Sequence, residues 1–176
     1  MAVNTVKRYV RFLEISYQAI LLRPLLPSAD ARLVKSPKLV WSDPGVARLL
    51  AERPGSDDGA MFETYVADEL LRWASWQNEP PGIHFFRTHA GLEVDFVLHG
   101  SGRLLAVEAK ASTRVHPADA RPIEDTLDAI RLPELARDAL RLGLVVYRGR
   151  EVTQIAPRVW AIPDWRLFGP DEMTPV

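Results

Sequence analysis

The chain has 176 residues, a length typical of one domain, and 47% of them are hydrophobic, which is enough to build a buried core. Its formal net charge of −1 argues against binding nucleic acid through overall charge, although a local basic patch is still compatible with the composition. The chain contains no cysteine, which excludes disulfides, zinc–thiolate sites and cysteine nucleophiles.

The sequence has no apolar run long enough to span a bilayer, and its N-terminus lacks a signal-peptide pattern. We therefore expect a cytoplasmic protein that does not bind a membrane. The Walker phosphate-loop pattern and the dinucleotide-binding glycine pattern are both absent.

The first two predicted elements are a helix over Asn4–Ile15 and a strand within Gln18–Arg23. Together they resemble the last helix and the wing of a winged-helix unit whose first helices are missing. We assign residues 1–33 to this partial winged-helix remnant and a linker. The basic residues of the helix have two interpretations: DNA contact, or the solvated face of a packing element. We favour the second, because a fragment of a motif is a weak match. These basic residues are Lys7, Arg8 and Arg11.

A short strand over Lys38–Trp41 and a helix from Pro44 to about Ala51 are predicted next, since proline is favoured at the first position of a helix. A long helix follows, capped by Asp57 or Asp58 and ending near Trp76. Glu63 lies beside its apolar stripe, either as a surface acid or as an acid angled toward the sheet. The stripe consists of Phe62, Val66, Leu70 and Trp73.

A β-hairpin is predicted from Gly91–Leu98 and Leu104–Lys110, joined by a two-residue turn at Ser101-Gly102. Side chains alternate along a strand, so each arm has two faces. In the first arm one face holds Leu92, Val94, Phe96 and Leu98, and the other holds Glu93 and Asp95. In the second arm one face holds Leu104, Ala106, Glu108 and Lys110.

This turn predicts that residues whose numbers sum to 203 face each other. Asp95 then lies opposite Glu108, and Glu93 lies opposite Lys110, with Cβ atoms roughly 4.5–5.5 Å apart. Two carboxylates that close repel each other unless a proton or a cation lies between them. Glu93 and Lys110 could instead form an ordinary cross-strand ion pair.

The remaining pattern completes an order of helix, three strands, helix and strand, which predicts a mixed α/β sheet with helices on both faces. The other predicted strands are Ile83–Arg87, Gly143–Tyr147, Glu151–Ile155 and Val159–Ile162. The other helical segments are Ala118–Ile130, Pro133–Leu142 and a short turn over Trp165–Phe168.

Asp95, followed on the next strand by Glu108-Ala109-Lys110, resembles the active-site pattern of the PD-(D/E)XK nuclease superfamily. Glu63 matches the extra acid that some members use. The resemblance implies a restriction-endonuclease-like fold in which Glu63, Asp95 and Glu108 hold Mg²⁺ and Lys110 assists an attacking water. Phosphodiester hydrolysis needs such a cation to polarise the phosphate, and Mg²⁺ prefers oxygen ligands. The spacing alone is weakly specific, because many strands end in Glu-x-Lys as solvated charge.

A longer set of motifs is similar to the C-terminal domain of prokaryotic AAA-type ATPases, catalogued as domain of unknown function 4143. The resemblance runs from about Thr5 to Phe168 and implies that residues 34–176 form the nuclease-like domain. Relatives carry an ATPase module and a winged helix before this domain, so we expect a truncated product or a split partner and carry over no ATP binding. The motifs are Val34–Val46, Phe62-Glu63, Glu69-Leu70, Glu93–Val97 and Val107–Lys110.

These observations lead to two main hypotheses. The first is a metal-dependent nuclease-like domain associated with an AAA-type ATPase, with Asp95, Glu108 and Lys110 as catalytic residues and Glu63, Asp95 and Glu108 as Mg²⁺ ligands. The alternative is a non-enzymatic module of the same fold that binds DNA or a partner and keeps the acids as a buried ion-pair cluster. A winged-helix DNA-binding protein is a third and weaker hypothesis. The expected partners are DNA, an AAA-type ATPase module or a second copy of the chain. A structural role at the sheet edge is expected for Lys35, Ser36, Pro37, Lys38 and Asp43.

Overall fold

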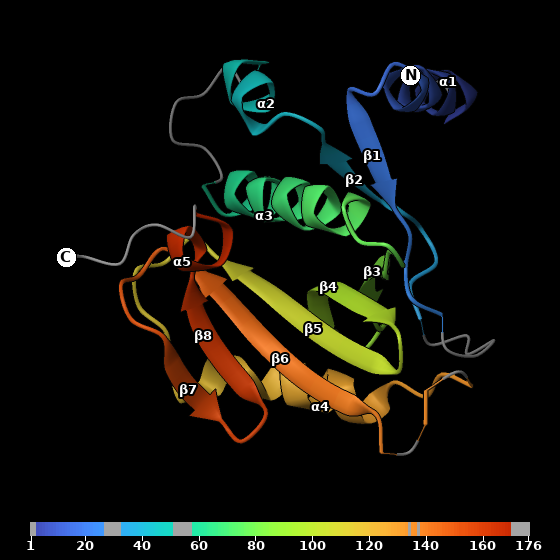
Figure 1. Ribbon diagram of the computed structural model, residues 1–176. Helices are drawn as coiled ribbons and strands as arrows, with labels where there is room; N and C mark the ends of the chain where they lie inside the picture. Colours follow the sequence, from blue (N-terminus) through green and yellow to red (C-terminus); the bar gives the residue numbers. More distant parts are fainter. Residues whose placement is uncertain (1–2, 27–32, 51–57, 134, 137, 170–176) are drawn as a thin grey trace.

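The computed structural model describes residues 3–26, 33–50, 58–133, 135–136 and 138–169. A six-stranded sheet forms its centre, with a helix packed on each face and a separate two-stranded ribbon beside it (Figure 1). In chain order the elements are α1 (Val3–Ile15), β1 (Ala19–Leu22), β2 (Lys38–Trp41), α2 (Pro44–Leu50), α3 (Asp58–Ser75), β3 (Gly82–Arg87), β4 (Glu93–Gly100), β5 (Arg103–Lys110), the 3₁₀ turn η1 (Pro117–Ala120), α4 (Arg121–Ala129), β6 (Leu140–Tyr147), β7 (Thr153–Ala156), β8 (Val159–Pro163) and α5 (Asp164–Phe168).

The sheet has the strand order β3-β4-β5-β6-β8-β7. β3, β4 and β5 pair antiparallel, whereas β6 is parallel to both β5 and β8. Parallel neighbours need a crossover connection, and α4 supplies it between β5 and β6. The predicted mixed α/β sheet flanked by helices is therefore confirmed. No helix in the described ranges is long and apolar enough to cross a membrane.

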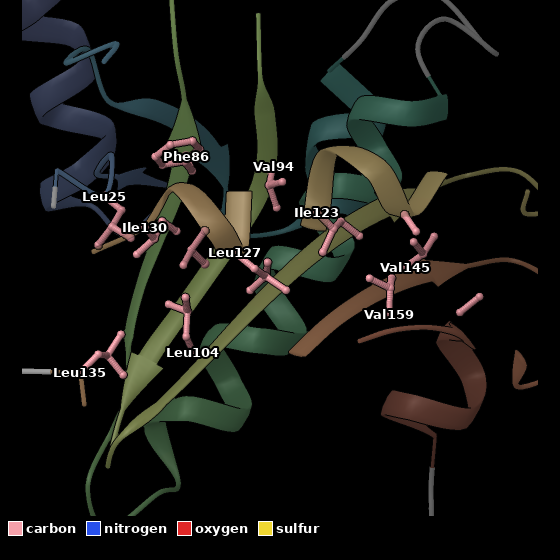
Figure 2. Packing of buried hydrophobic residues seen from close by; sticks show 14 of the residues in the cluster. Leu25, Phe86, Val94, Leu104, Ile123, Leu127, Ile130, Leu135, Val145 and Val159 are labelled. Carbon is pink, nitrogen blue, oxygen red and sulfur yellow. The ribbon is translucent and has the colours of Figure 1, made fainter. Parts of the chain in front are cut away.

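Two hydrophobic clusters hold the helices against the sheet. On one face, α4 packs Ile123 and Leu127 against Leu104 of β5 and Val145 of β6 (Figure 2). On the other face, α3 packs Phe62, Val66 and Leu70 against β4, β5 and β6. Burying an aliphatic or aromatic side chain contributes about 1.5–3 kcal/mol, so these clusters set the positions of both helices.

The predicted hairpin turn is confirmed. Ser101 and Gly102 have φ values of 46° and 71°, as a two-residue type I′ turn requires. The pairing runs from Gly100 opposite Arg103 to Phe96 opposite Val107, so the paired residue numbers sum to 203 as predicted.

The predicted face of Leu92, Val94, Phe96 and Leu98 is wrong, because β4 contains a β-bulge. Ile83 pairs with Leu98, but Phe86 pairs with Val94, so β4 has one extra residue opposite Phe85. An extra residue reverses the alternation of side chains beyond it. Val94 consequently lies in the α4 cluster, whereas Phe96 and Leu98 lie in the α3 cluster.

The predicted helix over Pro133–Leu142 is also wrong: none of its described residues is helical, and β6 begins at Leu140. Residues 140–142 pair in parallel with residues 103–105 of β5, and these backbone hydrogen bonds override the local helical pattern. Trp73, expected in the buried stripe of α3, is 48% exposed. Ala51 and Asp57, at predicted helix ends, lie outside the described residues.

The N-terminal elements lie at one edge of the sheet (Figure 1). α1 has the predicted position, but none of its residues is buried. β1 and β2 pair antiparallel into the two-stranded ribbon. Backbone bonds join the chain after β1 to β3: the Phe85 N–H donates to the Arg23 carbonyl (3.2 Å), and the Leu25 N–H donates to the Phe85 carbonyl (2.7 Å).

Candidate functional site

Glu63 lies on the sheet-facing side of α3, which decides between the two positions left open by the sequence. Its neighbours Phe62 and Val66 are buried against the sheet, and its own side chain is 21% exposed. The carboxylate contacts the ammonium of Lys38. Glu63 is therefore an inward acid and not a solvated surface residue.

Lys38 of β2 contributes a positive charge to a group of three carboxylates. Its Nζ contacts Glu63 Oε1, and it lies 3.2 Å from Asp95 Oδ1 and 3.8 Å from Glu93 Oε1. From its sequence motif, Lys38 is expected to have only a structural role at the sheet edge. The segment Val34–Val46 that contains Lys38 is recognisable in the sequence. The approach of the ribbon to α3 and β4 is a tertiary contact that no local pattern predicts.

These contacts change the pKa of both partners. Burial lowers the pKa of Lys38, but attraction to Asp95 and Glu63 outweighs that effect, and the net pKa lies above the ordinary lysine value. Burial and the negative charge of Asp95 raise the pKa of Glu63, and Lys38 offsets this only in part. Lys38 therefore stays charged, whereas Glu63 ionises less readily than a solvated glutamate.

Asp95 is built into the junction between β4 and β5. The antiparallel pairing ends at Phe96 and Val107, and one residue further the Asp95 Oδ2 accepts a hydrogen bond from the Ala109 N–H at 3.1 Å. The backbone N–H of Asp95 in turn donates to the Glu108 carboxylate. Asp95 and Glu108 are therefore adjacent, in accordance with the predicted pairing.

Glu108 is the most strongly perturbed acid of the site. Burial and the nearby charge of Asp95 raise its pKa to about 8, and Lys110 and the Asp95 N–H offset this only in part. Its Oε2 is buried and makes no hydrogen bond within the described part of the chain. Buried carboxylate oxygens are ordinarily paired, so this atom marks a position where a proton or a cation would be stabilised.

Lys110 does not pair with Glu93. Its Nζ lies 3.2 Å from Asp119 of η1, and Asp119 also accepts a hydrogen bond from the His116 N–H at 2.8 Å. Glu93 instead pairs with Arg87 at 3.4 Å and, more distantly, with Lys38. The ion pair between Lys110 and Asp119 could not be predicted from the sequence, because the position of Asp119 three residues after His116 indicates only the start of a helical turn.

The donor set fits a hard divalent cation in part. Asp95 and Glu108 are adjacent, the Glu108 Oε2 is unpartnered, and one or two carboxylates suffice for Mg²⁺, which keeps several waters. Among the residues that the structure describes, however, no three His, Cys, Asp or Glu side chains form a ready group of ligands. The Lys38 ammonium contacts both Glu63 and Asp95, so it occupies carboxylate oxygens that a cation would need.

Comparison with known families gives one match, and it covers most of the site residues. A family model described as domain of unknown function (DUF4143) matches residues 58–167. The chain belongs to this family. The match confirms the family expected from the sequence motifs, and the DUF4143 span contains all four predicted site residues: Glu63, Asp95, Glu108 and Lys110. Lys38 lies before the matched span. The search of curated proteins found no match.

Proposed function

We propose that this DUF4143 chain is a metal-dependent nuclease-like domain that hydrolyses phosphodiester bonds. One observation carries the proposal: Asp95 and Glu108 are joined through hydrogen bonds between their strands at the point where pairing ends, and Lys110 follows two residues later. A restriction-endonuclease-like fold is part of the proposal. The order α3, β3, β4, β5, α4, β6 supports it, because this order places an acid on each of two adjacent strands.

In this proposal Glu63, Asp95 and Glu108 hold Mg²⁺, with Asp95 and Glu108 as the principal ligands. The bound cation would polarise the phosphate and lower the pKa of an attacking water. The residues of the chain prepare the site for it. The Asp95 side chain is only 14% exposed, which strengthens its electrostatic interaction with a cation.

Lys110 has the role of assisting the attacking water and stabilising developing negative charge. Lys110 follows Glu108 by two residues on β5, so their side chains lie on the same face of the strand. Its positive charge lowers the pKa of Glu108. Asp119 restrains the ammonium through the 3.2 Å ion pair. Asp119 is therefore a positioning residue for Lys110.

The N-terminal elements complete the proposed organisation. In the proposal, α1 and β1 belong to a winged-helix remnant over residues 1–33. The nuclease-like domain covers residues 34–176 and begins with β2. None of the residues of α1 is buried, so this helix contributes nothing to the core of the central sheet. Association with an AAA-type ATPase is the proposed context.

The experiment that tests this function is cleavage of supercoiled, linear and single-stranded DNA with Mg²⁺ or Mn²⁺. Wild type is compared with Glu108→Gln and with Glu151→Gln, an exposed acid outside the site. We expect cleavage by wild type and by Glu151→Gln, and none by Glu108→Gln. Equal cleavage by all three proteins would place the activity elsewhere or in a contaminant.

A second candidate function is the non-enzymatic module that binds DNA or an ATPase partner. The contacts of Lys38 with Glu63, Glu93 and Asp95 favour it, because an internal ammonium can neutralise these acids without any metal. Calorimetric titration with Mn²⁺ separates the two functions. A folded wild-type protein that binds no Mn²⁺, and that gains no Mn²⁺ binding when Lys38 is replaced by methionine, would support the binding module and exclude the nuclease.

A further inference from the structure

The ammonium among the site acids comes from an element outside the central sheet. Lys38 belongs to β2, which pairs only with β1, whereas Glu63 belongs to α3 and Asp95 to β4. The Lys38 side chain therefore connects the ribbon to helix α3 and to strand β4. This is a specific long-range contact, since 57 residues separate Lys38 from Asp95.

Packing and backbone hydrogen bonds hold the ribbon in the position where Lys38 contacts these acids. Val40, two residues along β2, is 5% exposed and packs in the α3 cluster, as does Leu22 of β1. Alternate residues of a strand share a face, so Lys38 points to the same side as the buried Val40. The backbone bonds between Arg23 and Phe85 fix the ribbon to the edge strand β3.

The same oxygens cannot serve Lys38 and a divalent cation equally well. Mg²⁺ binds carboxylate oxygens at about 2.0–2.1 Å. With Lys38 Nζ at 3.2 Å from Asp95 Oδ1 and also against Glu63, a cation on these oxygens would lie a few ångströms from the ammonium. Two positive charges that close repel strongly where water is partly excluded.

We propose that Lys38 is a built-in competitor for the divalent cation: the cation binds Asp95 and Glu63 only when it displaces the Lys38 ammonium. The inference rests on the proposed function, because it takes a divalent cation as the ligand. Displacement of the ammonium would also remove the ion pairs that join the ribbon to α3 and β4. Occupancy of the site is thereby coupled to how firmly β1 and β2 are held, and the coupling is reciprocal.

The test is calorimetric titration of the full chain with Mn²⁺, comparing wild type, Lys38→Met and Lys35→Met. Methionine keeps much of the length of the side chain and removes its charge. Lys35 is an exposed lysine in the same segment and serves as the matched control. We expect Lys38→Met to bind Mn²⁺ about tenfold more tightly than wild type, within the range typical of coupling between two ligands. Lys35→Met should match wild type.

A second measurement separates competition from a change in folding. Lys38→Met should have a lower melting temperature than wild type in EDTA, because its acids have lost their counter-ion, and Mn²⁺ should raise that temperature more than it does for wild type. The double variant Lys38→Met/Asp95→Asn should lose the gain in Mn²⁺ affinity. Loss of the gain in the double variant would show that the higher Mn²⁺ affinity depends on Asp95.

The outcomes distinguish this inference from the proposed function. Tighter binding by Lys38→Met supports both, even if wild type binds too weakly to measure. Equal or weaker binding by Lys38→Met, with clear binding by wild type, overturns the competition and leaves the metal site intact. No binding by any folded variant overturns the proposed function together with the inference.

Discussion

The Asp95 carboxylate accepts a hydrogen bond from the backbone N–H of Ala109, 3.1 Å away on the neighbouring strand. This contact follows directly after the last backbone pair of β4 and β5, so a side chain takes over where a main-chain acceptor would otherwise continue the pairing. The bulge opposite Phe85 directs Asp95 and Phe96 toward the same face, since β4 has one residue more than β3 there. Asp95 thus has a structural role in addition to its proposed role as a ligand.

Two substitutions separate these roles. Asp95→Asn keeps an oxygen that can accept from Ala109 but removes the charge, so we expect a folded protein that has lost Mn²⁺ binding in calorimetry. Asp95→Ala leaves the Ala109 N–H without its acceptor, and we expect it to unfold more easily than Asp95→Asn by about 1–3 kcal/mol in urea denaturation. Wild-type Mn²⁺ affinity in Asp95→Asn would remove this residue from the proposed site.

Glu108 predicts a specific pH dependence of stability in the absence of divalent metal. Its pKa is raised from 4.5 to about 8 in the folded protein, so between these values the folded state binds more protons than the unfolded state. This contribution to stability is complete below about pH 4.5 and is lost as the pH rises through 8. The loss of this contribution should lower the free energy of unfolding by up to about 5 kcal/mol.

The matched variant for that measurement is Glu108→Gln, which keeps the shape of the side chain but does not titrate. Urea denaturation at intervals from pH 5 to pH 9 in EDTA should show a weaker pH dependence and a higher stability than wild type at pH 9. A pH dependence identical to that of wild type would mean that Glu108 ionises as an ordinary solvated glutamate.

Gly102 tests the turn that sets the hairpin pairing. Its φ is +71°, and a Cβ at this position would meet nothing within 4 Å, so a substitution acts only through the backbone. Gly102→Ala should lower the free energy of unfolding by about 1 kcal/mol. Ser101→Asn should be neutral or slightly stabilising, because asparagine tolerates a positive φ better than serine. Equal effects of the two substitutions in urea denaturation would argue against this turn.

Gly143 tests the packing of α4 on the sheet. A Cβ at Gly143 would collide with Ile123 of α4 and approach Val159 Cγ2 to 3.0 Å. Because both neighbours are fully buried, Gly143→Ala should cost about 1–3 kcal/mol of stability in urea denaturation. Wild-type stability in this variant would show that α4 can move away from β6 without penalty.

The features that depend on neighbouring residues could be predicted from the amino-acid sequence. Ser101-Gly102 allowed the turn, the turn set the pairing from Phe96 to Val107, and the pairing placed Asp95 beside Glu108. The same local patterns predict the order of helix, three strands, helix and strand. The observed mixed sheet confirms this order. Turn geometry and side-chain periodicity depend on only a few neighbouring residues, so both can be predicted from the sequence before the fold is known.

The charges that meet at the site could not be predicted in this way, because they come together through packing between distant elements. Pairing with β3 introduced the bulge that moved Phe96 to the α3 face, and the packing of the ribbon brought Lys38 to Glu63 and Asp95. The approach of η1 gave Lys110 its partner Asp119. These contacts join residues far apart along the chain, and their geometry depends on how whole elements pack, which the spacing of residues in the sequence does not specify.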